Sequence, residues 1–178
     1  QETEKMSIEV IQALVGTIDA KDKYTNGHSI RVAQYSKMIS KALGDSEEEQ
    51  KRVYYSALLH DIGKIGIPDT IINKPATLTE EEYDIVKTHP EIGSQILRSI
   101  TTMKEISVGA RWHHEHFDGS GYPVKLKGED IPKIARIIGV ADAYDAMTSN
   151  RSYRKYLPQD KVRQEFEENK SSQFDSKM

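Results

Sequence analysis

Histidine and aspartate are the residue types through which this sequence could bind metal ions, and several stand at informative positions. His60 and Asp61 are adjacent, and so are His113 and His114. Neighbouring residues on a helix point about 100° apart, so an adjacent pair suits two ions better than one. Asp142 lies inside IIGVADAYDAM, the most apolar helical stretch, where a carboxylate is costly unless it is paired or bound to a metal. The pattern predicts a centre of two metal ions.

The available donors limit which metals and which reactions fit. The chain has no cysteine, which excludes thiolate ligands, disulfides and cysteine nucleophiles. Imidazole and carboxylate ligands suit iron, manganese, zinc and similar ions. Asp61 is the natural bridge between two ions, because a carboxylate has two oxygens. Two neighbouring ions that share a hydroxide and hold the oxygens of a phosphoryl group would hydrolyse phosphate esters.

Helices must position these side chains, because helical periodicity dominates the chain and strand-like alternation is nearly absent. Apolar residues recur at three- and four-residue steps in 6–18 and 32–43. Further helices are expected over 45–61, 77–89, 91–100, 104–116, 133–147 and 159–169. Thr79 with Glu82 predicts a capping box at one helix start, and the Gly- and Pro-containing segment 117–132 predicts a long loop. The predicted fold class is all-α, in a single domain.

The composition narrows the class of protein. A chain of 178 residues with 37% apolar and 30% charged residues fits one well-solvated domain. The net charge of −3 argues against a DNA- or RNA-binding protein. No segment approaches the roughly 18 uninterrupted apolar residues of a membrane helix, and the start has no signal-peptide pattern. We therefore expect a cytoplasmic location and no membrane contact by this region.

Five motifs occur in order along nearly the whole chain, from about residue 5 to residue 176. They are YTNGHSIRVAQYS (24–36), ALLHDIGKIGIPD (57–69), THPEIG (88–93), RWHHEHFDGSGYP (111–123) and ARIIGVADAYDAMTSNRSYR (135–154). Together they resemble the HD-GYP subfamily of the HD superfamily of metal-dependent phosphohydrolases, the bacterial phosphodiesterases of cyclic di-GMP. The resemblance implies a helical HD bundle with a long GYP loop over 1–178. The first residue is Gln1, and we expect a fragment of a longer chain with an N-terminal sensory domain.

The resemblance also implies a ligand set and two divalent metal ions, with iron or manganese expected. The ligands that it assigns to the first metal are His28, His60, Asp61 and Asp142. The ligands that it assigns to the second metal are Asp61, which is shared, with His89, His113 and His114. Some members hold a third ion with a glutamate four residues before the first histidine. That position is Tyr24 here, which favours two metals. His116 stands where a basic residue is common, and it is not assigned as a ligand.

Three basic residues are expected to bind the substrate. Lys64 follows the HD pair by three residues, where its ammonium would contact a phosphate oxygen and stabilise developing charge or protonate the leaving oxygen. Arg151 and Arg154 would reach the second phosphate or a guanine, since arginine offers a planar fork of donors.

Three further residues carry predictions for substrate binding. Gly121 is expected to let the backbone approach the ligand closely. Tyr122 either stacks on a base or anchors the loop on the core. Asp145, one turn after Asp142, either accepts a hydrogen bond from a guanine edge or fixes an arginine.

The predicted function is hydrolysis of cyclic di-GMP to linear pGpG, with a second round giving GMP. One alternative is a phosphohydrolase of another nucleotide. A second alternative is a receptor or scaffold that binds cyclic di-GMP or a GGDEF-domain partner without hydrolysis. The resemblance implies GGDEF-domain proteins as partners, and the formation of a homodimer stays open.

Overall fold

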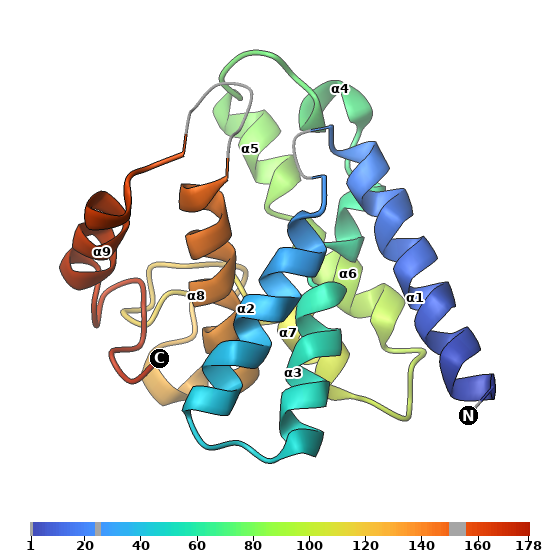
Figure 1. The fold of residues 1–178 in the computed structure, drawn as a ribbon. Coiled ribbons are helices and arrows are strands. Elements are labelled where there is room, and N and C mark those ends of the chain that lie inside the picture. The colour runs from blue at the N-terminus through green and yellow to red at the C-terminus, as the bar shows by residue number, and fades with distance from the viewer. Residues whose placement is uncertain (1, 24–25, 150–155) are drawn as a thin grey trace.

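The fold is known from a computed structural model, which describes residues 2–23, 26–149 and 156–178 (Figure 1). The α-helices of the described residues are α1 (Glu2–Lys21), α2 (His28–Ala42), α3 (Glu47–Leu58), α4 (Asp69–Ile72), α5 (Glu80–Val86), α6 (His89–Leu97), α7 (Glu105–Trp112), α8 (Lys133–Thr148) and α9 (Gln159–Glu168). Two 3₁₀ helices are η1 (Ile62–Gly66) and η2 (Gly128–Asp130). These residues form no strand, so the all-α prediction is confirmed. None of the described helices is both long and apolar enough to cross a membrane.

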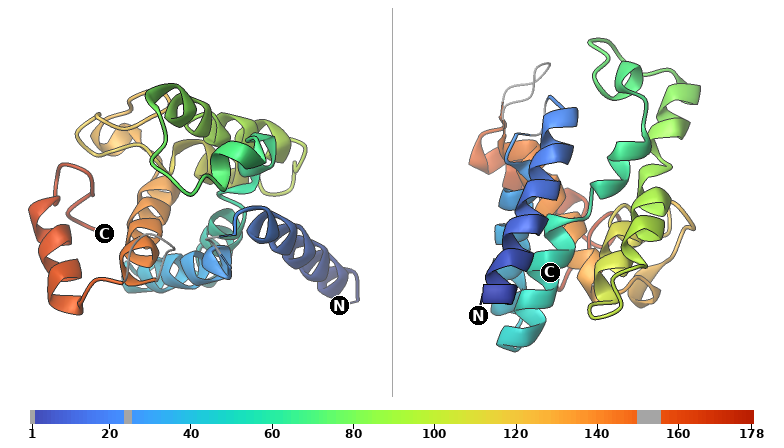
Figure 2. Two further views of the ribbon diagram at one scale, coloured as in Figure 1. Left: turned by 90° about the horizontal axis from the view of Figure 1, so that it is seen from above. Right: turned by 90° about the vertical axis from the view of Figure 1, so that its right-hand side faces the viewer.

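The core lies where α2, α3, α7 and α8 pack on one another, with α6 packed on α7 and η1 packed on α6. Buried apolar side chains of this core include Val32, Leu58, Ile106 and Ile138. Helix α1 runs along one edge of the molecule and α9 lies at the opposite edge (Figure 2). The predicted metal-site residues come from the central helices and their ends, which the core holds in place.

Helix starts follow the sequence closely. At α5, the Thr79 hydroxyl accepts from the backbone N–H of Glu82, and the Glu82 carboxylate accepts from the N–H of Thr79, which confirms the predicted capping box. Ser46 and Glu49, both within the acidic DSEEEQ segment, form the same reciprocal pair at the start of α3.

Four helices, α3, α5, α6 and α7, end at least three residues earlier than the periodicity predicts. Helix α3 ends at Leu58 rather than at residue 61, and α7 ends at Trp112 rather than at residue 116. The adjacent pairs His60-Asp61 and His113-His114 therefore both lie on turns that follow a helix. A turn is free of the 100° spacing of a helix, so both members of each pair can face the same centre.

Candidate metal centre

Seven imidazole and carboxylate side chains from five segments of the chain converge at one place. Their ligand atoms form two groups, each with all its atoms within 4.8 Å of one another. The first group contains His28, His60 and Asp142, and the second contains Asp61, His89, His113 and His114. Helix starts supply His28 and His89, helix ends supply the two adjacent pairs, and α8 supplies Asp142. These seven residues are the ones that the resemblance implies as ligands, and Asp61, which it assigns to both metals, belongs to the second group.

Asp61 lies between the two groups with one oxygen toward each. Its Oδ2 is 3.7 Å from His28 Nε2 and 3.4 Å from His60 Nε2. Its Oδ1 is 3.3 Å from His89 Nε2 and 3.8 Å from His113 Nε2. This arrangement suits a carboxylate that bridges two cations.

Four imidazole rings are oriented by hydrogen bonds on the side away from the centre. Three rings donate from Nδ1 to a backbone carbonyl: His60 to Ala57 O (2.6 Å), His89 to Val86 O (2.7 Å) and His113 to Ala110 O (2.9 Å). His28 donates from Nδ1 to the Asp145 carboxylate (2.7 Å). A carbonyl can only accept, so the rings of His60, His89 and His113 carry a proton on Nδ1 and turn Nε2 inward. His60 Nε2 is buried and has no hydrogen-bond partner. Such orientation by an outer hydrogen bond is typical of metal-ligating histidines.

The protonation states also suit metal binding. Burial lowers the pKa of His113 well below its usual value, and it lowers the pKa of His114 to about 3, so both rings are neutral at physiological pH. Burial alone would raise the pKa of Asp61, but His60 and Lys64 beside it hold that pKa well below its usual range. His113 and His114 therefore offer lone pairs, and Asp61 offers a carboxylate, to divalent cations.

The HD-domain family model matches residues 12–178. The chain belongs to the HD-domain family. The 3′3′-cGAMP-specific phosphodiesterase 3 of Vibrio cholerae is 39% identical over 166 residues, covering 93% of this chain and 36% of that protein. A cyclic di-GMP phosphodiesterase of Thermotoga maritima is 42% identical over 168 residues, covering 93% of this chain and 46% of that protein. The chain thus spans between about a third and a half of the length of these curated relatives.

The HD fold is also found among solved structures. The crystal structure of a cyclic GMP-AMP-specific phosphodiesterase of V. cholerae superposes with a TM-score of 0.68 at 21% identity. The match covers 94% of this HD chain and 46% of that chain. The Gly121-Tyr122-Pro123 triplet is consistent with the HD-GYP subfamily.

Asp145 of this HD domain supports the metal centre from behind. It is 1% exposed, and besides His28 Nδ1 it accepts from Arg31 Nε at 2.6 Å and Arg31 Nη2 at 3.1 Å. Of its two predicted roles, the position favours the fixing of an arginine over contact with a guanine. Sequence reasoning missed Arg31, although its place one turn after His28 on α2 was a signal.

Lys64 lies at the edge of the centre. Its Nζ is 2.8 Å from Asp61 Oδ2 and 3.1 Å from Asp22 Oδ2. Burial would lower the pKa of Lys64, but the two carboxylates raise it above its usual value, so the side chain is an ammonium. Asp22 was not singled out by sequence reasoning. Arg151, Arg154 and Tyr24 lie outside the described residues.

The GYP segment packs on the centre itself. The Tyr122 ring stacks on the His114 ring, with centroids 4.8 Å apart and an interplanar angle of 23°. This contact favours the loop anchor among the two roles predicted for Tyr122. A Cβ on Gly121 would lie 2.3 Å from His116 N and 2.4 Å from His114 O, so the close approach expected toward a ligand is made to the chain's own backbone.

Two other polar residues shape this part of the HD domain. Glu115, which is 7% exposed and was missed by sequence reasoning, accepts from Val124 N at 2.8 Å and Leu126 N at 3.0 Å and so ties down the loop. His116 pairs through Nδ1 with Ser120 Oγ at 3.0 Å and belongs to neither ligand group.

Proposed function

We propose that this chain is a metal-dependent phosphodiesterase that opens cyclic di-GMP to linear pGpG and then to GMP. The observation that carries the proposal is Asp61, whose two oxygens face two separate groups of ligands. The donors fit two divalent ions, iron or manganese, and the described centre offers no thiolate to favour softer metals. Relatives named for cyclic di-GMP and 3′3′-cGAMP hydrolysis support a cyclic dinucleotide as substrate.

The residues of the chain have distinct tasks in this reaction. When bound, two divalent ions activate water and stabilise negative charge on a phosphoryl group. Asp61 and the histidines hold the ions, and Asp145 keeps His28 oriented. Lys64 brings a positive charge to the edge of the same centre, where it stabilises charge developing on phosphorus-bound oxygen or protonates the leaving 3′ oxygen.

The substrate is tested with a panel. Protein loaded with Mn²⁺ or Fe²⁺ under reducing conditions is incubated with cyclic di-GMP, 3′3′-cGAMP, cyclic di-AMP and nucleoside monophosphates, and products are separated by chromatography. We expect cyclic di-GMP to be consumed fastest. The relative at 39% identity favours 3′3′-cGAMP as the second candidate. No turnover of any member with both metals bound contradicts the enzyme proposal, and tight binding without decay indicates a receptor.

The bridge is tested by Asp61→Ala. Removal of the carboxylate that faces both groups is expected to abolish retention of both ions and all activity, as measured by metal analysis and by the same panel. Asp84→Ala is the matched control, because the Asp84 side chain is 70% exposed and forms an ion pair with Lys87 away from the centre. An Asp61→Ala protein that keeps two equivalents of metal contradicts the bridge.

Location and partners complete the proposal. We place the protein in the cytoplasm, with a GGDEF-domain protein as partner of the GYP loop, where Val124 is 50% exposed. Cell fractionation and pull-down with a purified GGDEF domain test these two points, and sedimentation measures whether a homodimer forms.

A further inference from the structure

The last turn of α1 is fastened to the segment that follows the HD pair. Asn73 donates from Nδ2 to Lys21 O at 2.8 Å and accepts at Oδ1 from Lys23 N at 3.1 Å. Lys21 Nζ in turn donates to Ile65 O at 2.7 Å and lies 3.3 Å from Asp69. One amide side chain therefore holds the backbone on both sides of residue 22.

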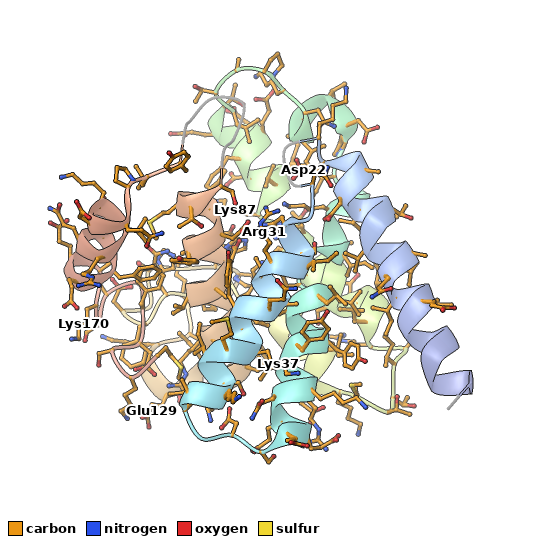
Figure 3. The ribbon with its side chains drawn as sticks, viewed as in Figure 1. Asp22, Arg31, Lys37, Lys87, Glu129 and Lys170 are labelled. Carbon is orange, nitrogen blue, oxygen red and sulfur yellow. The ribbon has the colours of Figure 1, made fainter. Side chains whose placement is uncertain are left out.

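That residue is Asp22, at the C-terminal end of α1 (Figure 3), and it is 6% exposed. Its Oδ2 is 3.1 Å from Lys64 Nζ, which is itself 2.8 Å from Asp61 Oδ2. The ammonium is thus shared between two carboxylates, one of them the oxygen that faces His28 and His60. Without Asp22, the ammonium would be drawn wholly to Asp61, where it would compete with a cation for the same oxygen.

Near the same end of α1, Asp19 accepts from Gly27 N at 3.1 Å and from Ser29 Oγ at 3.0 Å. Val15 and Ile18 are buried in the core, whereas Val10 and Leu14 are 53% and 48% exposed. The helix lies along one edge of the molecule in the left view of Figure 2. The polar contacts at its end therefore set where Asp22 lies relative to Lys64.

On the basis of the proposed function, we propose that Asn73 is a positioning residue for Lys64, because it holds the end of α1 and keeps Asp22 beside the ammonium. Lys64 is then held between Asp22 and Asp61 rather than by Asp61 alone.

The first test needs no catalysis. Metal-free protein is treated briefly with an amine-acylating reagent, and modification of each lysine is followed by mass spectrometry. Asn73→Ala and Asp22→Asn are each expected to raise the rate at Lys64 about threefold, the equivalent of one weak ion pair, with the rate at Lys161 unchanged. Asp69→Asn is the control, because its side chain is 76% exposed and the Lys21 bond to Ile65 remains.

The second test measures kcat and KM of metal-loaded protein. Asn73→Ala is expected to lower kcat about tenfold with KM within about threefold and two equivalents of metal still bound. If Asn73 acts through Asp22, the double variant Asp22→Asn/Asn73→Ala is no slower than Asp22→Asn alone. Asn73→Asp keeps the acceptor for Lys23 N and loses the donor to Lys21 O, so we expect an intermediate kcat. This variant also keeps the test decisive if the alanine variant folds poorly.

The outcomes separate this proposal from the proposed function. Unchanged acylation of Lys64 in Asn73→Ala, or additive losses of kcat in the double variant, overturns the positioning role. A wild-type protein that hydrolyses no cyclic dinucleotide contradicts the proposed function, while the acylation test still decides whether Asn73 and Asp22 hold Lys64.

Discussion

Gly63 offers a sharp test of how the second ligand group is placed. It lies in η1, where the chain passes over the start of α6. A Cβ built on Gly63 would lie 1.8 Å from His89 O and 2.5 Å from Gly93 N. These are backbone atoms, so no side chain can turn aside, and Gly63→Ala must push η1 and α6 apart.

The size of the displacement follows from the contact. An ordinary contact begins at 3.4 Å, so the backbone at His89 must move by about 1.6 Å to lengthen the 1.8 Å separation to that distance. Metal–ligand distances tolerate only about 0.2 Å, and His89 Nε2 faces Asp61 Oδ1 across 3.3 Å. We expect the second ion to be lost and the free energy of unfolding to fall by about 1–3 kcal/mol.

The assay compares two glycine-to-alanine variants by urea unfolding and by metal analysis. Gly16 lies within α1 and a Cβ there meets nothing within 4 Å. Gly16→Ala should therefore raise the free energy of unfolding by about 0.4–1 kcal/mol and keep two equivalents of metal. The reasoning is refuted if Gly63→Ala binds two equivalents and unfolds within about 0.5 kcal/mol of wild type.

Three further predictions concern the surroundings of the centre. Asp145→Asn removes the charge that orients His28, so Mn²⁺ affinity measured by equilibrium dialysis should fall about 10–100-fold; equal affinity would exclude that role. Burial lowers the pKa of His28, but hydrogen bonds to neighbouring carboxylates outweigh it and raise the pKa to about 9. The metal-free protein should therefore keep the resulting stabilisation of about 3 kcal/mol below pH about 6.5 and lose it as the pH rises through 9. Urea unfolding across that window measures the loss, and a flat profile would contradict it. Glu115→Ala leaves Val124 N and Leu126 N without their acceptor, so the free energy that protects these two amides from hydrogen exchange should fall by about 1–3 kcal/mol. Unchanged exchange rates would show that other contacts hold the loop.

Much of this protein was predictable from its residues in order. The three- and four-residue spacing of apolar side chains predicts the helices because a helix brings such positions onto one face. Thr79 and Glu82 predict a helix start because their reciprocal bonds are local. The residue types of the ligand set were likewise readable, since histidines and aspartates without cysteine suit few metals.

Other features depend on contacts between distant parts of the chain. Arg31 and Asp145 are 114 residues apart in sequence, and Lys64 and Asp22 are 42 residues apart, so no local spacing reveals either pair. The ends of α3 and α7 also differ from the periodicity, because packing at Gly63 and Gly121 favours turns there.

The sequence by itself therefore determined which side chains are present and which helices carry them, because these follow from residue type and local hydrogen bonding. The tertiary structure alone decided which oxygen of Asp61 faces which histidines, and which carboxylates hold Lys64 and His28. Those relations are distances between segments, and only the packing of α1, α2, α6 and α8 around one core sets them.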